Sequence, residues 1–132
     1  MTRAAESKKK KILLVDDDPL IIRMYEHKLA QDGHDVVLAF DGEQAVMMAK
    51  EEKPDLILLD LMMPKLNGIE TLQFLKKEAD TKGIPVIVLT NIGDDSAYQK
   101  RAEELGAIDY VVKAQISLKE LAEKVAAALS KK

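Results

Sequence analysis

Residues 12–19 read Ile-Leu-Leu-Val-Asp-Asp-Asp-Pro, an apolar run that ends in three acids and a proline. A short, continuous apolar run of this kind is typical of a parallel strand that is covered on both faces. Asp18 followed by Pro19 marks a helix start, because aspartate caps free N–H groups and proline suits the first helical position. The stretch therefore predicts a buried strand that leads directly into a helix, with Asp16 and Asp17 between them.

Four more runs rich in Val, Ile and Leu follow along the chain. We predict these to be strands: Val36–Ala39, Leu56–Leu59, Val86–Leu89 and Ile108–Val112. Apolar residues at helical spacing lie between and after the strands, as at Ile21, Tyr25 and Leu29, and at Leu118, Leu121, Val125 and Leu129. Because crossover connections between parallel strands are right-handed, such alternation gives a parallel sheet with helices on both faces. The sequence predicts a three-layer α/β fold of the (βα)5 type.

Short polar motifs mark the predicted helix ends. Three pairs have the spacing of reciprocal N-terminal capping: Asp41 with Gln44, Asn67 with Glu70, and Ser117 with Glu120. Gly33 and Gly106 stand where helices are expected to stop. Met47 and Met48, inside the second predicted helix, are interpreted as core or near-core residues.

Length and composition exclude several classes of protein. The chain has 132 residues, enough for one domain with a genuine core. It has no cysteine, which excludes disulfide scaffolds, thiolate metal sites and cysteine nucleophiles. No apolar run reaches the roughly 20 residues that span a bilayer, and no export signal is visible, so we expect a cytoplasmic protein without membrane contact.

Charge is unevenly distributed along the chain. Residues 1–11 contribute +4, whereas the whole chain has a formal net charge of −3, so the remainder carries −7. We expect residues 1–10 to be a disordered basic tail and residues 11–130 to be an acidic domain that does not bind nucleic acid directly. The last predicted helix runs almost to Lys132, which leaves no room for an output domain.

Polar side chains follow four of the five predicted strands. Asp16 and Asp17 follow the first, Asp60 the third, Thr90 the fourth and Lys113 the fifth. Ligands of open parallel sheets bind beyond these carboxyl ends. Converging carboxylates need a cation, and a set of oxygen ligands without His or Cys suits Mg²⁺.

The same edge suits phosphoryl chemistry. Thr90 can offer a hydroxyl and Lys113 a positive charge to phosphoryl oxygens. Asp60, alone at the end of a buried strand, is the best-placed carboxylate to accept a phosphoryl group as an acyl phosphate. Taken singly, an Asp or Thr at a strand end is more often a turn residue, and a lone Lys is more often a solvated surface side chain. Asp18 is better explained as a helix cap. The combination on four strand ends favours function.

At these residues the sequence resembles a receiver domain of two-component response regulators. The resemblance covers about residues 11–129. It is carried by Leu14-Val15-Asp16-Asp17-Asp18-Pro19, Leu59-Asp60-Leu61-Met62-Met63-Pro64 with Asn67-Gly68, Leu89-Thr90, and Tyr110-Val111-Val112-Lys113. It implies a flavodoxin-like fold with strand order 2-1-3-4-5.

The resemblance also implies roles for individual residues. Asp60 would accept a phosphoryl group from a sensor histidine kinase or a histidine phosphotransfer protein. Asp17, Asp60 and the backbone carbonyl of Met62 would bind Mg²⁺ directly, with Asp16 assisting. Thr90 would bond to the phosphoryl group, Lys113 would pair with its charge, and Tyr110 would turn inward as the switch residue.

As a whole, the resemblance implies a switch rather than a turnover enzyme. It would hydrolyse its phosphoryl group slowly and signal to a downstream effector protein, as a monomer or a phosphorylation-linked dimer.

Three positions depart from or refine the family pattern. Ala114 stands where the family usually has a proline with a cis bond, so the Lys113–Ala114 bond is either cis under strain or trans with a rearranged loop. Asn91 replaces a small residue after Thr90 and either hinders phosphoryl access or adds a hydrogen bond. Met62 and Ile92 are apolar where the family tunes loss of the phosphoryl group, and either exclude water or cover the pocket mouth.

The main alternative is an enzyme. Asp16-Asp17-Asp18 has the Asp-x-Asp spacing of haloacid-dehalogenase-type phosphatases, in which Asp16 would be the nucleophile and Asp18 the acid/base. Pro19 and the absence of a cap domain do not fit that family. A nucleotide-binding protein is disfavoured because no Gly-rich loop ends in Lys-Ser/Thr. A receiver fold that is never phosphorylated is disfavoured by the complete set of acids, Thr90 and Lys113.

Overall fold

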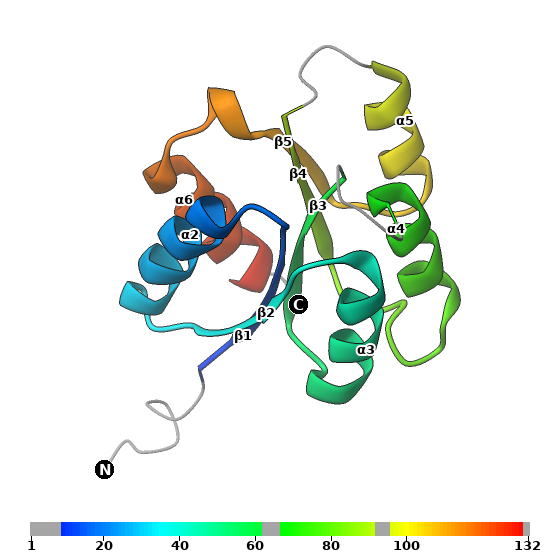
Figure 1. The fold of residues 1–132 in the computed structure, drawn as a ribbon, viewed down its shortest axis with the longest axis horizontal. Coiled ribbons are helices and arrows are strands. Elements are labelled where there is room, and N and C mark those ends of the chain that lie inside the picture. Colours follow the sequence, from blue (N-terminus) through cyan, green and yellow to red (C-terminus); the bar gives the residue numbers. More distant parts are fainter. Residues whose placement is uncertain (1–8, 62–66, 92–95, 131–132) are drawn as a thin grey trace.

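The computed structural model describes residues 9–61, 67–91 and 96–130. Five parallel strands form one sheet in the order β2-β1-β3-β4-β5, which confirms the predicted fold class and strand order (Figure 1). The strands are β1 Lys11–Val15, β2 Asp35–Ala39, β3 Leu56–Asp60, β4 Val86–Thr90 and β5 Asp109–Val112. The helices are α2 Pro19–Gln31, α3 Gly42–Glu52, α4 Gly68–Lys77, α5 Ser96–Glu104 and α6 Leu118–Ser130, with a short 3₁₀ helix, η1, at Lys113–Gln115.

The strands lie in register, so their carboxyl ends meet at one edge of the sheet. Val15 of β1 is level with Ala39 of β2 and with Leu59 of β3. Asp60 is level with Leu89, the residue before Thr90. All five predicted strands differ from the observed ones by one residue at most at each end; Ile108 lies just before β5 and is exposed.

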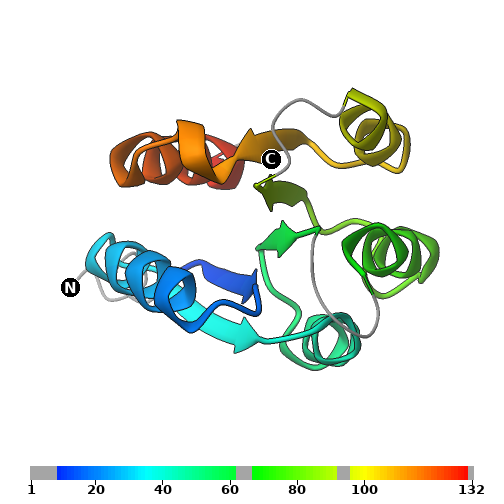
Figure 2. The same ribbon diagram turned by 45° about the horizontal axis from the view of Figure 1, so that its top comes forward.

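Helices cover both faces of the sheet, with α2 and α6 on one side and α3, α4 and α5 on the other (Figures 1 and 2). Alternate residues of β1 serve the two sides. Leu13 and Val15 pack in the core under α3–α5, and Ile12 and Leu14 pack in the core under α2 and α6. Because both faces are covered, the central strands are apolar at nearly every position.

Capping interactions begin the helices largely as predicted. The Asp18 carboxylate accepts a hydrogen bond from Leu20 N at 3.0 Å at the start of α2. Asn67 with Glu70 and Ser117 with Glu120 each form both bonds of a capping box. The third predicted box is incomplete: Asp41 accepts from Gln44 N, but the Gln44 side chain accepts from Phe40 N, one residue before the cap.

Two glycines terminate helices as predicted. Gly33 follows α2 with φ +93° and donates its N–H to Ala30 O at 3.0 Å. Gly106 follows α5 with φ +106° and donates to Glu103 O at 3.0 Å. This backbone region strains residues that carry a Cβ, so glycine is the residue that lets the chain turn back towards the sheet at both places.

Several predicted helix faces are rotated slightly from the observed ones. In α2, Ile22 is buried with Tyr25 and Leu29, whereas Ile21 is only partly covered. Leu118 is exposed because it is the first residue of α6. Met48 packs against the core, but Met47 points outward with half of its surface exposed, so the prediction of a core role for Met47 is wrong.

Two further predictions concern the basic N-terminal tail and membrane-spanning segments. Residues 1–8 of the predicted basic tail lie outside the described residues. Within the described part of the chain, no helix combines the length and the apolar character needed to cross a membrane.

Candidate functional site

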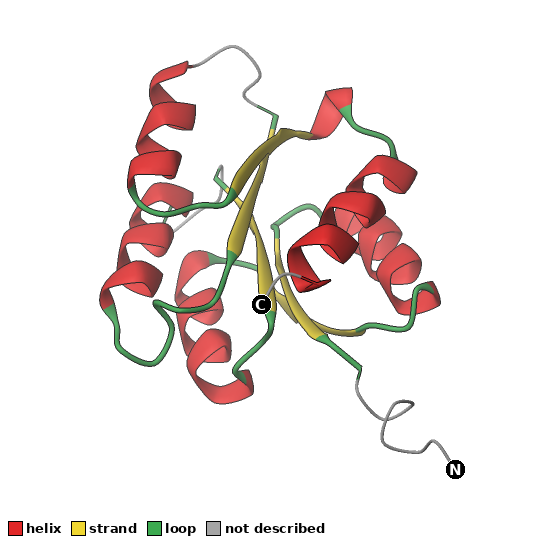
Figure 3. Cartoon of the chain, turned by 180° about the vertical axis from the view of Figure 1, so that it is seen from behind, coloured by secondary structure: helices red, strands yellow, loops and turns green. Residues whose placement is uncertain are grey.

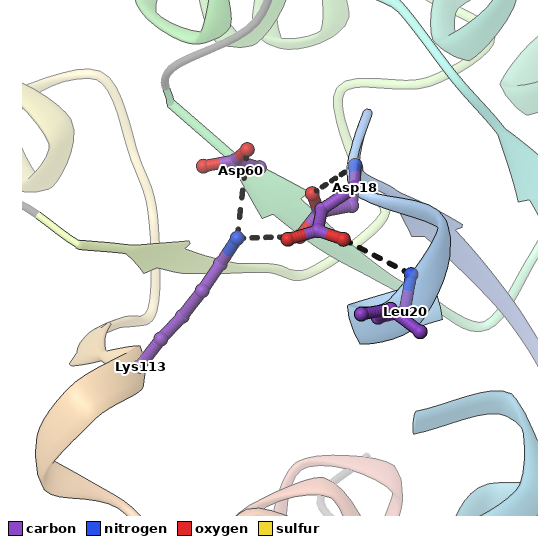
Figure 4. Close-up of polar contacts among 5 residues, drawn as sticks. Asp18, Leu20, Asp60 and Lys113 are labelled. Carbon is purple, nitrogen blue, oxygen red and sulfur yellow. Dashed lines mark hydrogen bonds and ion pairs between the residues drawn. The ribbon is translucent and has the colours of Figure 1, made fainter. Parts of the chain in front are cut away.

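Four strand ends bring the predicted site residues to one edge of the sheet. Asp16 directly follows β1, and Lys113 directly follows β5. Asp60 and Thr90 are the last residues of β3 and β4. Figure 4 shows Lys113 reaching across this edge towards Asp60 and the residues near Asp18. Positions almost a hundred residues apart in the chain therefore become neighbours.

Most of these polar groups are withdrawn from water. Asp16 and Thr90 are fully buried and Asp60 is 3% exposed, whereas Asp17 lies at the exposed rim. Charged side chains rarely occupy such positions without compensation, because an isolated buried charge is costly. The burial of two carboxylates side by side points to a built site rather than to a solvated turn.

Asp16, Asp17 and Asp60 form a carboxylate cluster in which one oxygen from each lies within 4.8 Å of the others. At neutral pH three such carboxylates repel one another, and among the described residues only the ammonium of Lys113 forms an ion pair with the cluster. A net negative charge lined by hard oxygen donors fits Mg²⁺, which prefers one or two carboxylates and retains several waters. The residues present thus fit the predicted metal.

Lys113 supplies the positive charge of the site. Its Nζ lies 2.5 Å from Asp16 Oδ2 and 3.6 Å from Asp60 Oδ2, and its side chain is 6% exposed (Figure 4). Burial by itself lowers the pKa of this ammonium, but the hydrogen bond to Asp16 and the charges of Asp60 and Asp16 outweigh burial, so the pKa is raised. Lys113 is therefore positively charged at neutral pH, and its closest partner is Asp16.

Asp18 has a structural role at the edge of the site. Its carboxylate accepts the hydrogen bond from Leu20 N, and its own N–H donates to Asp16 Oδ1 at 3.0 Å (Figure 4). The side chain is exposed and caps α2. Asp18 therefore orients Asp16 through its backbone, which does not match the acid/base role of the phosphatase alternative.

Thr90 and Tyr110 lie on the face of the sheet that α3, α4 and α5 cover. Thr90 is level with Val112 of β5, and Tyr110, two residues earlier on β5, is level with Val88. Tyr110 is half-buried and packs against the same core cluster as Val88. The predicted switch pair therefore shares one face of two adjacent strands.

Gly68 makes a contact that the sequence alone does not reveal. A Cβ on Gly68 would lie 2.2 Å from Leu61 Cα and 2.7 Å from Asp60 O, and Gly68 N donates to Leu61 O at 3.0 Å. The start of α4 is therefore pressed against the backbone of Asp60. In the sequence Gly68 was visible only as part of a motif, because this contact depends on the path of the chain between them.

Tyr25 is a second residue whose position was not predicted to involve the site. It is buried on α2 in the core cluster that includes Leu14 and Val111, each two residues before a site residue. Burial raises the pKa of its phenol, and the charges of Lys113, Asp16 and Asp60 also act on it. Its helical spacing predicted only a core side chain.

The structure describes some of the positions that depart from the family pattern but not all of them. The Lys113–Ala114 peptide bond is trans and begins η1, which settles the choice that the sequence left open. Asn91 is exposed immediately after β4. Met62, predicted to offer a carbonyl to the metal, and Ile92 lie outside the described residues.

Comparisons with known proteins identify relatives of the whole domain. The family of response regulator receiver domains matches residues 12–126. A probable transcriptional regulator, ycf27, of Cyanophora paradoxa is 50% identical over 108 residues, 82% of this chain and 44% of that protein. Protein PilH of Pseudomonas aeruginosa is 40% identical over 105 residues, 78% of this chain and 84% of that protein. The chain spans about half the length of the first curated relatives that it matches.

Solved structures agree with the sequence relatives. The receiver domain of the Francisella response regulator 1452 has a TM-score of 0.85 and 32% identity, covering 93% of this chain and 98% of that one. The receiver domain of sensor histidine kinase PA1611 from Pseudomonas aeruginosa, with a magnesium ion in its active-site cleft, has a TM-score of 0.84 and 28% identity, covering 93% and 99%. These matches give no support to the phosphatase alternative. The chain belongs to the response regulator receiver domain family of two-component signalling systems.

Proposed function

We propose that Asp60 is the residue that accepts the phosphoryl group. One observation carries the proposal: the Asp60 carboxylate is buried at the end of the central strand β3, within 4.8 Å of the acids Asp16 and Asp17 and within 3.6 Å of Lys113 Nζ. Asp16 is engaged by Lys113 and by Asp18 N, and Asp17 stands at the exposed rim. Asp60 is the acid around which the other groups converge.

The reaction is a phosphoryl transfer between two proteins. An Asp60 carboxylate oxygen forms a bond to phosphorus, and the bond between phosphorus and the imidazole nitrogen of the donor histidine breaks. The imidazole leaves and takes a proton from solvent. Slow hydrolysis reverses the state, because water attacks phosphorus, the acyl phosphate bond breaks, and the Asp60 carboxylate and inorganic phosphate are released.

Asp16, Asp17 and Asp60, with the backbone carbonyl of Met62, would hold Mg²⁺. When bound, the ion offsets the repulsion between the carboxylates and the incoming phosphoryl oxygens. The magnesium ion in the related PA1611 receiver domain supports this assignment. Asp18 N keeps Asp16 oriented through the 3.0 Å hydrogen bond to Oδ1.

Lys113 and Thr90 would recognise the phosphorylated state. Lys113 already lies within reach of Asp60, so a small movement from Asp16 brings its charge to the phosphoryl oxygens. Thr90 can donate its hydroxyl from the neighbouring strand end. Tyr110 shares the face of the sheet with Thr90, so we assign Tyr110 as the side chain that moves when Thr90 is drawn towards the phosphoryl group.

The proposal extends to partners and domain limits. The phosphoryl donor is a sensor histidine kinase or a histidine phosphotransfer protein in the cytoplasm, and the output is a changed surface read by an effector protein. Residues 11–130 form the receiver domain, and residues 1–10 take no part in the phosphoryl transfer. The switch requires a difference of only a few kcal/mol between its two states.

The direct test is phosphorylation of the full chain by a small acyl-phosphate donor. We expect incubation with acetyl phosphate and Mg²⁺ to add the mass of one phosphoryl group, measured on the intact protein. The D60N variant should gain no mass, and removal of Mg²⁺ with EDTA should prevent the gain in the wild type. The matched control is D80N, which changes an exposed aspartate far along the chain and should leave the gain intact. A phosphoryl group that persists in D60N would refute the assignment.

A further inference from the structure

Two exposed apolar side chains lie on neighbouring helices outside the phosphoryl site. Met47 on α3 is 50% exposed and Phe74 on α4 is 47% exposed. The two helices contact each other on one side of the sheet, the side on which α5 also lies, as the view from behind in Figure 3 shows. Neither side chain belongs to the core clusters, so about half of each apolar surface faces solvent.

An ion pair between α3 and the end of α4 indicates which levels of the two helices correspond. Lys50 Nζ of α3 lies 3.4 Å from a carboxylate oxygen of Glu78, just beyond the end of α4. Both helices connect parallel strands on the same face, so they run in the same direction. Met47 precedes Lys50 by about one turn, and Phe74 precedes Glu78 by about one turn, which places Met47 and Phe74 at the same level.

The charges around this pair follow the same pattern on both helices. On α3 an acid, an apolar residue and a base occur at Glu43, Met47 and Lys50, and on α4 the same pattern occurs at Glu70, Phe74 and Lys77. Each set has the spacing i, i+4, i+7, so it forms a column along one side of its helix. We call these six residues the α3–α4 patch. It is acidic at one end, apolar in the middle and basic at the other.

Helix dipoles explain part of this pattern, because acids favour the first turn of a helix and bases the last. They do not explain the apolar pair in the middle. They also leave charges unused: Glu43 and Lys77 form no ion pair with any residue that the structure describes. Among the described residues, the Glu70 carboxylate accepts one hydrogen bond, from Asn67 N at 3.3 Å in its capping box.

We propose that the α3–α4 patch binds a second copy of this chain, as a symmetric dimer in which the two patches face each other with their helices antiparallel. The two-fold axis lies in the interface, across the helices at the level of Met47 and Phe74. This rotation places Glu43 opposite Lys50 of the other copy and Glu70 opposite Lys77. The two apolar side chains meet their own copies at the axis.

The charge pattern selects this arrangement over the parallel one. A two-fold axis parallel to the helices, between α3 and α4, would place Glu43 opposite Glu70 of the other copy and Lys50 opposite Lys77, which is repulsive at both ends. A patch of one charge would repel itself in every orientation. Two exposed apolar side chains and four ion pairs form a small interface, so the dimer is weak and its population depends on concentration.

Charge reversal tests the interface in solution with the full chain. The K50E/K77E variant makes the patch wholly acidic, and E43K/E70K makes it wholly basic. We expect sedimentation equilibrium, from about 10 μM to about 1 mM, to show self-association of the wild type that is weakened at least about tenfold in either variant. An equimolar mixture of the two variants should associate at least as tightly as the wild type. The E104K/E123K variant reverses two acids on α5 and α6 and should associate like the wild type.

The absence of cysteine from the chain allows a geometric test. Met47 lies beside the two-fold axis, so the M47C variant should form a disulfide-linked dimer on mild oxidation, at least about tenfold faster than Q99C, which places a cysteine on the exposed side of α5. Circular dichroism of each variant checks that it is folded.

Monomeric wild type at all concentrations would overturn the proposal. So would variants that associate like the wild type, a mixture no tighter than its components, or equal cross-linking of M47C and Q99C.

Discussion

Lys113 is bound to Asp16, a proposed metal ligand, at 2.5 Å, and it lies farther from Asp60, the proposed phosphoryl acceptor, at 3.6 Å. The Asp16 carboxylate therefore binds the Lys113 ammonium in this structure and would bind Mg²⁺ when the ion is present. Binding of the cation and release of the lysine are coupled, because both neutralise the charge of Asp16. The ammonium that is displaced has Asp60 as its nearest other carboxylate.

Removing the Lys113 charge should strengthen Mg²⁺ binding. In K113M the cluster of Asp16, Asp17 and Asp60 loses its competing cation, and we expect the Mg²⁺ affinity to rise about tenfold, a change well within the energy of two charges at this separation. Isothermal titration calorimetry at pH 7 measures it. D16N removes one carboxylate and should weaken Mg²⁺ binding. An unchanged affinity in K113M would show that Lys113 does not compete with the ion.

The same lysine should stabilise the fold when no metal is present. Loss of Lys113 leaves Asp16 and Asp60 buried without their counter-charge, so we expect K113Q to lower the free energy of unfolding by about 2 kcal/mol in EDTA. Mg²⁺ should restore most of the loss, because the cation replaces the missing charge. Urea unfolding with and without Mg²⁺ measures both effects. An equal loss in both conditions would assign the role of Lys113 to packing alone.

Gly68 should be intolerant of any side chain. In G68A the new Cβ would collide with backbone atoms of Leu61 and Asp60 that cannot rotate away, and we expect a loss of about 2 kcal/mol or more in the free energy of unfolding. Phosphorylation by acetyl phosphate should also slow, because the strain acts on the backbone of Asp60.

Gly83 offers a matched control for this substitution. A Cβ there would meet no atom within 4 Å, and its φ is not in the left-handed region. G83A should therefore leave stability unchanged or raise it by about 0.5 kcal/mol, through the reduced freedom of the unfolded chain. Equal effects of G68A and G83A would contradict the close contact at Asp60.

Lys76 should give the wild type a distinctive pH dependence. Its Nζ donates to Lys82 O at 3.2 Å and to Ile84 O at 2.8 Å, and burial lowers its pKa below the usual 10.5. Between the lowered pKa and 10.5 the unfolded chain binds more protons at this site than the folded one, so this contribution to stability rises with pH. The unfolding free energy of wild type minus that of K76M should increase as the pH rises towards 10.5. A difference that is flat or falls would contradict this sign.

The fold was predictable because its signals are local. The five strands are short apolar runs, and most helix starts are marked by a polar residue whose partner is two or three positions away, as at Asp18 and Asn67. The exceptions are Ile21 and Met47. Ile21 lies next to the buried Ile22, at the edge of the core face of α2. Met47 was assigned to the core for its apolar character, but it lies two residues from the buried Ala45 and Ala49, which places it on the opposite side of α3.

The sequence predicted which strand-end residues would lie close together, but not which of them are in direct contact. The sheet topology brings Asp16, Asp60, Thr90 and Lys113 to one edge whatever their rotamers. Which carboxylate holds Lys113 depends on distances of about an ångström that no spacing in the sequence encodes. The contact of Gly68 with Asp60 depends on how α4 packs against the end of β3, which no spacing in the sequence encodes.

The bond between Lys113 and Asp16 joins residues 97 positions apart in the chain. Any fragment that holds both must span residues 16–113, and their contact depends on a sheet order that brings the carboxyl ends of β1 and β5 to one edge. The proposed phosphoryl site therefore depends on the whole sheet and not on one local segment. A chain in which β5 has detached from the sheet would present Asp60 without Lys113, so we expect the proposed phosphoryl transfer to require the folded sheet.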